Sequence, residues 1–465
     1  MTAVRVGGGL GFYGDSYRPA LNLVEAGHVQ YVAFDHLAEL TLAILAKDRR
    51  RDPSLGYARD LLPLLRFLWP AAVQRGVRLI SNAGGLNPMA AGAAAAQVAH
   101  DLGLSARIGV VHGDDFRGRL DLVEWDDSDP SAPPPVFANA YVGAAPILSA
   151  LDQGADLVIT GRVADSALFL GAIAHALHWD LSGAGPIDWN RLALGAVAGH
   201  LLECSGQVTG GNHSGHWQSI PDLDRIGYPI AELSDTGTLR ITKVPGSGGR
   251  VTRDTVREQL LYEVHDPSRY LTPDVTVDLS ETWLADAGPD MVDVCDVRGH
   301  VRPDAYKVLA GCPDGFLGQG LIGFSWPDAL DKAEAAAAIL ARQVQAMSLS
   351  TTAPTAEYLG VSSFHGPLAA PVDRGRVNEV YLRMTLRTAT RGAADAFARL
   401  FPPLALSGPP TASGLLGVDR VRELFWSRTG LIPRSVLDRG VRVDVRPAPA
   451  FYAGGSETRG GSTLL

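Results

Sequence analysis

The sequence has few cysteines, no long apolar run and no excess of positive charge. Three cysteines in 465 residues cannot build a disulfide framework, which favours a reducing, cytoplasmic location. No window reaches about 18 uninterrupted apolar residues, so we expect no membrane span. The formal net charge of −9 argues against a nucleic-acid partner, because phosphates attract basic surfaces. The N-terminal residues also lack the charged and apolar segments of a secretory signal.

The residues that are present describe a globular chain. Hydrophobic residues make up 46% and charged residues 20% of the sequence. Domains run to about 100–200 residues, so 465 residues suffice for two sizeable cores. The 52 glycines and 30 prolines cluster in loops and form no repeat of fixed period, which indicates many tight turns near a ligand.

The N-terminal half repeats one pattern, in which a short apolar run leads into a polar or glycine-bearing loop and then a helical segment. The apolar runs lie at residues 4–6, 29–34, 77–81, 107–111 and 156–160. This pattern predicts an α/β fold in which a parallel sheet of βα units carries ligand groups along one edge.

The second half reads differently, as an α+β region into which the parallel sheet merges. We expect an α/β lobe at residues 1–205, an α+β lobe at 206–446 that completes the pocket, and a C-terminal tail at 447–465. A single merged sheet is the alternative.

Polar side chains follow the predicted strands, where open α/β sheets bind their ligands. Asp35 is either a catalytic carboxylate or the N-cap of the next helix. Asp165 is a second catalytic candidate, and the loop after residues 77–81 offers a nest for an anion or a carbonyl. The substrate-binding candidates in these loops are Asp15, Asn82, Gly84, Gly85, Asn87 and Arg162.

The densest group of polar side chains is GHLLECSGQVTGGNHSGH, residues 199–216, at the end of a predicted helix. Such a helix end leaves backbone groups free for a ligand. Glu203 faces the negative end of the helix dipole, which raises its pKa and suits it to acid–base work; a salt bridge to Arg162 is the alternative. The substrate-binding candidates here are Gln207, Thr209, Gly210, Gly211 and Asn212. We expect the loops after residues 6, 34, 81, 160 and 204 to converge on one pocket.

Cys204 has three interpretations. It could be a nucleophile activated by His200, one helical turn earlier. It could join His200, His213 and His216 in a zinc-type ligand set. It could also be a small side chain that packs the helix end. We favour packing, so we predict no metal site and expect Glu203 to matter more for turnover than Cys204.

A second glycine-rich loop precedes a predicted helix near residues 254–265. It consists of Gly246, Ser247, Gly248 and Gly249. Lys243 and Arg250 flank it, which predicts that its backbone N–H groups bind a carboxylate or phosphate. A plain tight turn is the alternative.

Seven stretches in one order carry a specific resemblance. They are GGGLGFYGD (7–15), AFDHLAELTLAIL (33–45), SNAGGLNP (81–88), ITGRVADSALFL (159–170), HLLECSGQVTGGN (200–212), KVPGSGG (243–249) and YEVHDPSRYLTPDV (262–275). Together they resemble the acyclic terpene utilisation family, AtuA, from Val4 to about Val445. The resemblance implies the core domain, without the further ferredoxin-like domain of some members.

The family is named after growth on citronellol and geraniol, a pathway that works on branched acyl-CoA thioesters. The resemblance therefore implies a small-molecule enzyme, and with the acids above we expect hydratase or hydro-lyase chemistry on an acyl thioester or branched carboxylic acid. A Cys-dependent acyl transferase or hydrolase and a non-catalytic ligand-binding subunit are the alternatives. The expected partners are a small-molecule substrate and further copies of the chain, as a homo-oligomer; the sequence identifies no cofactor.

Overall fold

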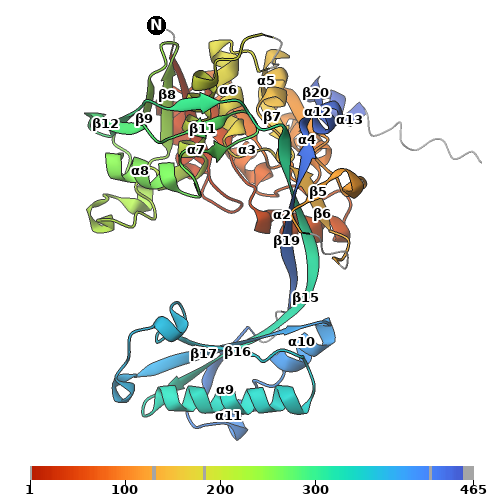
Figure 1. Cartoon of the computed structure of the whole chain (residues 1–465), viewed down its shortest axis with the longest axis vertical. Coiled ribbons are helices and arrows are strands. Elements are labelled where there is room, and N and C mark those ends of the chain that lie inside the picture. Colours follow the sequence, from red (N-terminus) through yellow and green to blue (C-terminus); the bar gives the residue numbers. More distant parts are fainter. Residues whose placement is uncertain (1–2, 128–131, 182–184, 418–420, 454–465) are drawn as a thin grey trace, which may run out of the picture. The chain divides into compact units, whose positions relative to one another are not determined.

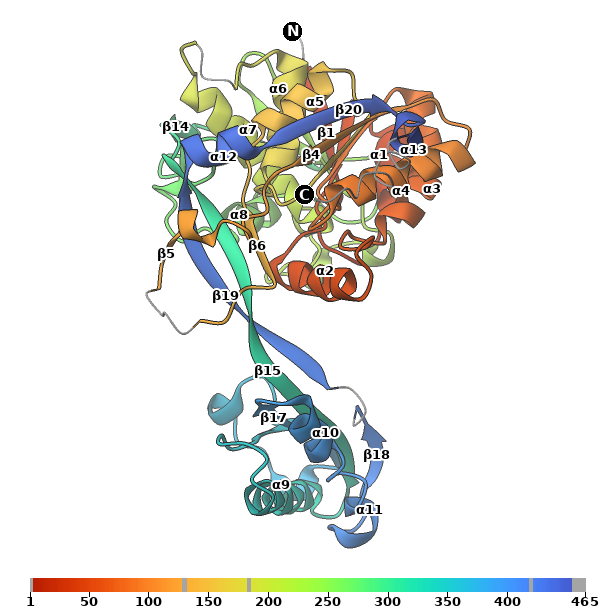
Figure 2. The same cartoon turned by 90° about the vertical axis from the view of Figure 1, so that its right-hand side faces the viewer.

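The computed structural model describes residues 3–127, 132–181, 185–417 and 421–453. The chain forms two compact units (Figures 1 and 2). The first unit comprises Met1–Pro130, Pro135–Gly311 and Ser427–Leu465, and the second comprises Ser131–Pro134 and Cys312–Trp426. The boundary expected between residues 205 and 206 therefore falls inside the first unit.

One large sheet organises the first unit, with the strand order β12-β13-β9-β8-β1-β2-β3-β7-β4-β20. Its centre is parallel and consists of β1 (Ala3–Leu10), β2 (Tyr31–Phe34), β3 (Arg78–Ser81), β7 (Leu157–Thr160) and β4 (Arg107–His112). The expected mixed α/β character is confirmed.

Antiparallel strands extend this sheet on both sides. On one side lie β8 (Pro229–Ser234), β9 (Leu239–Lys243), β13 (Met291–Cys295) and β12 (Trp283–Gly288), and on the other β20 (Arg442–Pro447). Of these strands, β8 pairs directly with β1, so strands on both sides of the predicted lobe boundary share one sheet. Part of the predicted tail, residues 447–453, ends β20 and forms α13 (Ala450–Ala453); residues 454–465 lie outside the described residues.

Alternate residues of the central strands enter two different cores. On β2, Tyr31 and Ala33 pack with α5 (Ala145–Asp152), α6 (Ala167–Leu177) and α7 (Trp189–Glu203). Val32 and Phe34 pack in the other core with α1 (Arg18–Ala26), α3 (Leu61–Arg75) and α4 (Pro88–Asp101). A strand buried on both faces reads as a continuous apolar run, which explains why the sequence shows short apolar runs without alternation.

The C-terminal part of α7 lies very close to its neighbours because glycines remove side chains at the contacts. A Cβ on Gly8 of β1 would lie 2.4 Å from the carbonyl oxygen of Leu202. A Cβ on Gly199 would lie 2.5 Å from the carbonyl oxygen of Ser166. These two contacts seat the helix end beside β1 and the loop after β7, and so place Glu203 at the edge of the sheet.

Gly199→Ala should lower the free energy of unfolding by about 1–3 kcal/mol, because the added methyl group overlaps a backbone carbonyl that cannot move alone. Urea denaturation measures this. Gly118→Ala is the matched control, since a Cβ there meets nothing within 4 Å, and it should change stability by less than about 1 kcal/mol. Equal stabilities of the two variants would show that the helix end is not seated by this contact.

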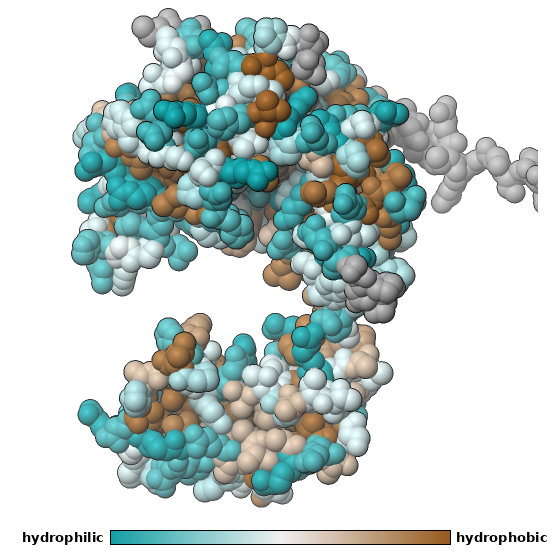
Figure 3. Space-filling model, in the orientation of Figure 1, coloured by the Kyte–Doolittle hydropathy of each residue, from teal (hydrophilic) through white to brown (hydrophobic). Residues whose placement is uncertain are grey.

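The second unit is built around the later part of β15 (Ala305–Ser325), which pairs with β17 (Glu379–Thr388). β17 in turn pairs with β16 (Thr355–Leu359), and side chains from α9 (Ala329–Ala346) and α10 (Arg391–Ala398) complete one core with these strands. Hydrophilic residues cover most of the visible surface of each unit, with apolar patches between them (Figure 3). No described helix is long and apolar enough to cross a membrane. The expected homo-oligomer and cytoplasmic location stay predictions.

Candidate functional site

A cavity of about 990 Å³ opens in the first unit, where loops that follow three central strands meet the end of α7. The loop after β1 contributes Asp15, the loop after β2 contributes Asp35, and the loop after β7 contributes Arg162 and Asp165. The predicted site residues that line this cavity are Asp15, Asp35, Arg162, Asp165, Glu203, Cys204, Gln207, Gly211 and Asn212. The carboxyl ends of parallel strands meet at one edge, which brings these distant segments together.

Other predicted binding residues lie outside the cavity wall. They are Asn82, Gly84, Gly85, Asn87, Thr209, Gly210, Gly246, Ser247, Gly248 and Gly249. Asn87 caps α4 by accepting a hydrogen bond from the Ala90 N–H, and the Thr209 hydroxyl donates to backbone carbonyls at residues 206 and 227. Asn82 acts on the cavity indirectly, through Asp35.

The glycine-rich loop at residues 246–249 is closed by contacts within the chain. The Ser247 N–H donates to the Val244 carbonyl within the turn, and the Gly248 and Gly249 N–H groups donate to carbonyl oxygens at residues 225 and 221. Lys243 donates to the Ser247 carbonyl and lies 3.1 Å from the carboxylate of Asp290. Because these three donors and Lys243 already have partners, the tight-turn alternative describes the loop better than the predicted anion site does.

Asp35 is a buried carboxyl group that faces the cavity. The helix α2 begins at Glu39 with Ala38 at its N-cap, so the alternative that Asp35 caps this helix is wrong. Oδ1 of Asp35 accepts hydrogen bonds from Asn82 Nδ2 at 2.6 Å and from the Leu37 N–H at 3.1 Å. Burial, and then the nearby Asp165, raise the pKa of Asp35 well above its usual value. With Oδ1 engaged as an acceptor, Oδ2 is the oxygen suited to hold the proton.

Arg162 lines the cavity and is buried, with 3% of its surface exposed. Its Nη2 lies 2.8 Å from Oδ1 of Asp165, and its Nη1 donates to the Leu37 carbonyl at 2.8 Å. Its guanidinium carbon lies 4.0 Å from the ring centroid of Tyr141. The predicted salt bridge from Arg162 to Glu203 is therefore replaced by one to Asp165.

Glu203 pairs with His200 one helical turn earlier on α7. His200 Nδ1 lies 2.9 Å from Oε1 of Glu203, and both side chains are buried. Burial raises the pKa of Glu203 to about 7; Asp165 adds to this rise and His200 opposes it. Burial lowers the pKa of His200, but the Glu203 carboxylate outweighs burial and raises it above the usual value. A carboxyl group with a pKa of about 7 is suited to general acid–base catalysis near neutral pH.

Cys204 is half-buried beside Glu203. Burial, and then the negative charge of Glu203, raise the pKa of the thiol far above its usual value. A thiol that stays protonated at neutral pH is a poor nucleophile, so the geometry favours the packing interpretation over nucleophilic catalysis.

The sequence matches the family described as acyclic terpene utilisation family protein AtuA over residues 4–443. The chain belongs to the AtuA family. Neither a curated protein nor a solved structure matches it. The matched range includes every residue that lines the cavity of this AtuA-family chain.

The cavity of this AtuA-family chain is also lined by residues that the sequence analysis did not predict as site residues. Tyr270 of β10 (Tyr270–Leu271) places its hydroxyl 3.5 Å from Nδ1 of His200. Glu263, Tyr141 and Lys307 also line the cavity. Tyr270 and Glu263 lie in the polar stretch at residues 262–275, but the local sequence does not reveal that this stretch reaches the cavity. Tyr141 and Lys307 carry no local signal of this kind. A second cavity of about 310 Å³ shares all four and is also lined by His200.

Backbone strain marks the wall of the cavity. Ser205, Asn212 and Glu263 line it and adopt positive φ angles of 45°, 54° and 59°, which non-glycine residues rarely do. The hydroxyl of Ser205 donates to Asp15 Oδ2 at 2.8 Å, and the hydroxyl of Tyr228 donates to Asp15 Oδ1 at 3.0 Å. Asp15 therefore ties the loop after β1 to the end of α7. Strain of this kind persists where a site is held in one geometry.

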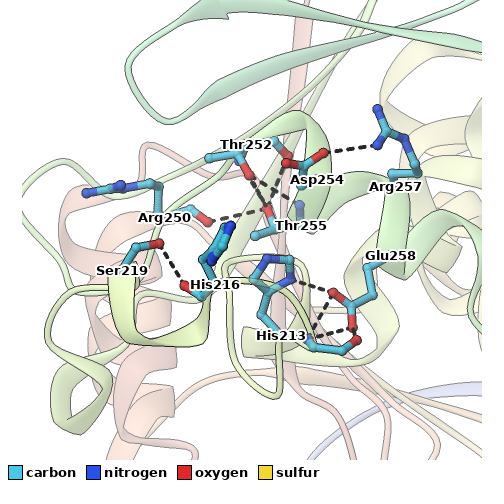
Figure 4. A network of polar contacts seen from close by, with 10 residues as sticks. His213, His216, Ser219, Arg250, Thr252, Asp254, Thr255, Arg257 and Glu258 are labelled. Carbon is cyan, nitrogen blue, oxygen red and sulfur yellow. Dashed lines mark hydrogen bonds and ion pairs between the residues drawn. The ribbon is translucent and has the colours of Figure 1, made fainter.

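His213 and Glu258 belong to a polar network whose residues do not themselves line the cavity (Figure 4). His213 Nδ1 and the Ser214 hydroxyl contact the carboxylate of Glu258 on α8 (Arg253–Leu261), and the Ser214 N–H donates to it at 3.0 Å. Hydrogen bonds from Ser214, and then the contact with His213, lower the pKa of Glu258. In the part of the chain that the structure describes, no three His, Cys, Asp or Glu side chains are placed to hold a metal ion, so the zinc-type alternative is not assembled.

Glu203→Gln should stabilise the protein at pH 8 and lose this advantage towards pH 5. The folded-state pKa of about 7 exceeds the unfolded value of 4.5, so the folded state binds the proton more tightly. The free energy of unfolding therefore falls as pH rises from about 4.5 to about 7, because the buried Glu203 carboxyl group is harder to ionise in the folded state than in the unfolded state. Glutamine removes the cost of this ionisation, on the order of 1–3 kcal/mol above pH 7. Urea denaturation at the two pH values measures the difference.

Glu258→Gln is the matched control and should have the opposite sign. Its folded pKa is lowered, so Glu258 contributes stability above its unfolded pKa and loses it as pH falls. Glu258→Gln should be less stable than the parent chain at pH 8. A pH-independent stability difference between Glu203→Gln and the parent would contradict the raised pKa of Glu203.

Proposed function

We propose that this AtuA-family chain is an acid–base enzyme of the hydratase or hydro-lyase type. Its substrate is an acyl thioester or a branched carboxylic acid with a double bond next to the carbonyl group, or the corresponding hydroxy compound. The observation that carries the proposal is the His200–Glu203 pair beside the carboxyl groups of Asp35 and Asp165 in one cavity. Family membership supports small-molecule chemistry but names no reaction.

The geometry supports a division of roles for the addition of water. Glu203, supported by His200, accepts a proton from water, whose oxygen then bonds to the β-carbon. Asp35, which can hold a proton on Oδ2, supplies the proton that the α-carbon gains. Arg162 provides fixed positive charge near the negative charge that develops on the carbonyl oxygen. Elimination of water follows the reverse path.

The alternatives have less support. A Cys-dependent acyl transferase or hydrolase needs a reactive thiolate, whereas the pKa of Cys204 is raised. A non-catalytic binding subunit would not need several carboxyl groups whose pKa values are raised in one cavity.

Hydration of model thioesters in ¹⁸O-labelled water tests the proposal. The purified full chain is incubated with but-2-enoyl and 3-methylbut-2-enoyl N-acetylcysteamine thioesters, and with the matching free acids. We expect ¹⁸O at the β-carbon and loss of the conjugated absorbance with at least one compound. The proposal would be contradicted if folded protein catalysed neither the hydration of these compounds nor the dehydration of the matching hydroxy compounds.

A further inference from the structure

We infer that Lys307 binds an anionic group of the ligand, a carboxylate or a phosphate, where the two cavities meet. The substrate would then be a small anionic carbonyl compound. The inference rests on the proposed function only for the position of the reacting carbonyl group; binding of the anion is a separate property of the site.

Lys307 belongs to the part of β15 that lies in the first unit. It lines both the larger cavity and the smaller one, and its side chain is exposed. Its ammonium nitrogen lies 5.1 Å from the ring centroid of Tyr141, which also lines both cavities. The cation is therefore held over an aromatic ring inside the site.

The buried cationic side chains of the site are already paired with carboxyl groups. Arg162 is paired with Asp165, and His200 is paired with Glu203. Among the described residues, Lys307 forms no ion pair, although Asp165, Glu203 and Glu263 line the same two cavities. Arg269 is also without an ion pair in the described chain, but it lines only the larger of the two. An uncommitted ammonium group at this junction is available to a ligand anion.

Lysine is unusual in this chain, which makes the position of Lys307 informative. The sequence has 41 lysines and arginines, of which only four are lysines. Lys243 is paired with Asp290, and Lys332 of the second unit donates to the Ser325 carbonyl at 3.0 Å. A compact ammonium group suits an anion that is approached as a point charge, whereas arginine suits a flat, two-pronged contact.

Distances to Tyr141 limit the size of the ligand. Arg162 lies 4.0 Å and Lys307 lies 5.1 Å from the same ring centroid, so the two charged groups are at most about 9 Å apart. Arg162 in turn holds Asp165, one of the proposed acid–base groups. A single small molecule can therefore reach Lys307 with its anion and the carboxyl cluster with its carbonyl group.

Calorimetric titration with a matched pair of probes tests this inference. The probes are 4-oxopentanoate, which has a ketone and a carboxylate, and 4-oxopentanamide, which has the same shape without the charge. The parent chain should bind the acid at least about tenfold more tightly than the amide. Lys307→Met should abolish this difference, and Lys307→Arg should keep most of it. Lys332→Met, the same substitution in the second unit, should bind both probes as the parent does.

Inorganic phosphate is then titrated as a competitor of 4-oxopentanoate. Displacement shows that Lys307 binds phosphate as well as carboxylate, and no displacement shows that the site is specific for carboxylates. Three results would overturn the inference. They are equal affinity for acid and amide in the parent chain, no binding of either probe at millimolar concentration, and an unchanged preference for the acid in Lys307→Met. The two proposals can fail independently. The proposed function fails if the hydration assay shows no reaction, even where Lys307 still binds the anion.

Discussion

Glu203→Gln is expected to lower turnover by about 100- to 10,000-fold, the usual contribution of a general acid–base group. Glutamine preserves the shape of the side chain and can still accept a hydrogen bond from His200, but it cannot exchange a proton. The expected gain in stability of the same variant at pH 8 separates a loss of chemistry from a loss of fold. The hydration assay with the most active thioester measures the rate.

Cys204→Ala is the comparison for this prediction and should retain most of the activity. Its thiol is held protonated beside Glu203, so its removal leaves the acid–base pair in place. A larger loss of turnover in Cys204→Ala than in Glu203→Gln, or a covalent acyl adduct on Cys204, would reverse the assignment in favour of nucleophilic catalysis.

Arg162→Met is expected to lower the free energy of unfolding by about 1–3 kcal/mol, because it leaves the partly exposed carboxyl group of Asp165 and a buried carbonyl without their partner. Arg162→Lys should recover little of this, since an ammonium group cannot donate to both and also lie flat on Tyr141. Urea denaturation at pH 7 measures both variants.

Arg257→Met is the matched control for this loss. Arg257 pairs with Asp254 at 3.0 Å, but both side chains are more than half exposed, so the expected change is below about 1 kcal/mol. A similar small change in Arg162→Met would mean that the pair of Arg162 and Asp165 does not hold the loop after β7 in place.

The parallel core of the fold could be anticipated because each of its elements is encoded locally. Short apolar runs, each followed by a polar loop and a helical pattern, occur where β1, β2 and β7 are found. The two units could not be anticipated. β15 extends from Ala305 to Ser325, but Gly311, Gly315, Gly318, Gly320 and Gly323 interrupt any apolar alternation along it. The sequence therefore gives no sign that one strand continues from the first unit into the second.

The acidic part of the site could also be anticipated. Asp35, Asp165 and Arg162 directly follow predicted strands, and His200 and Glu203 are three positions apart on one helix face. The local sequence did not reveal how the loop at residues 246–249 is closed, because the Gly248 and Gly249 N–H groups donate to carbonyls at residues 225 and 221. Lys307, Tyr270 and Glu263 reach the cavity only through tertiary structure.

We propose that this cavity tunes Glu203 for acid–base chemistry, and a ¹³C NMR titration of the glutamate carboxyl groups tests this without a substrate. The full chain is labelled at the glutamate side-chain carboxyl carbon and titrated from pH 4 to pH 9, with Glu203→Gln used to assign the signal. We predict one resonance with an apparent pKa of about 7 that is missing in the variant. A Glu203 signal that titrates near the ordinary value of 4.5 would contradict the account.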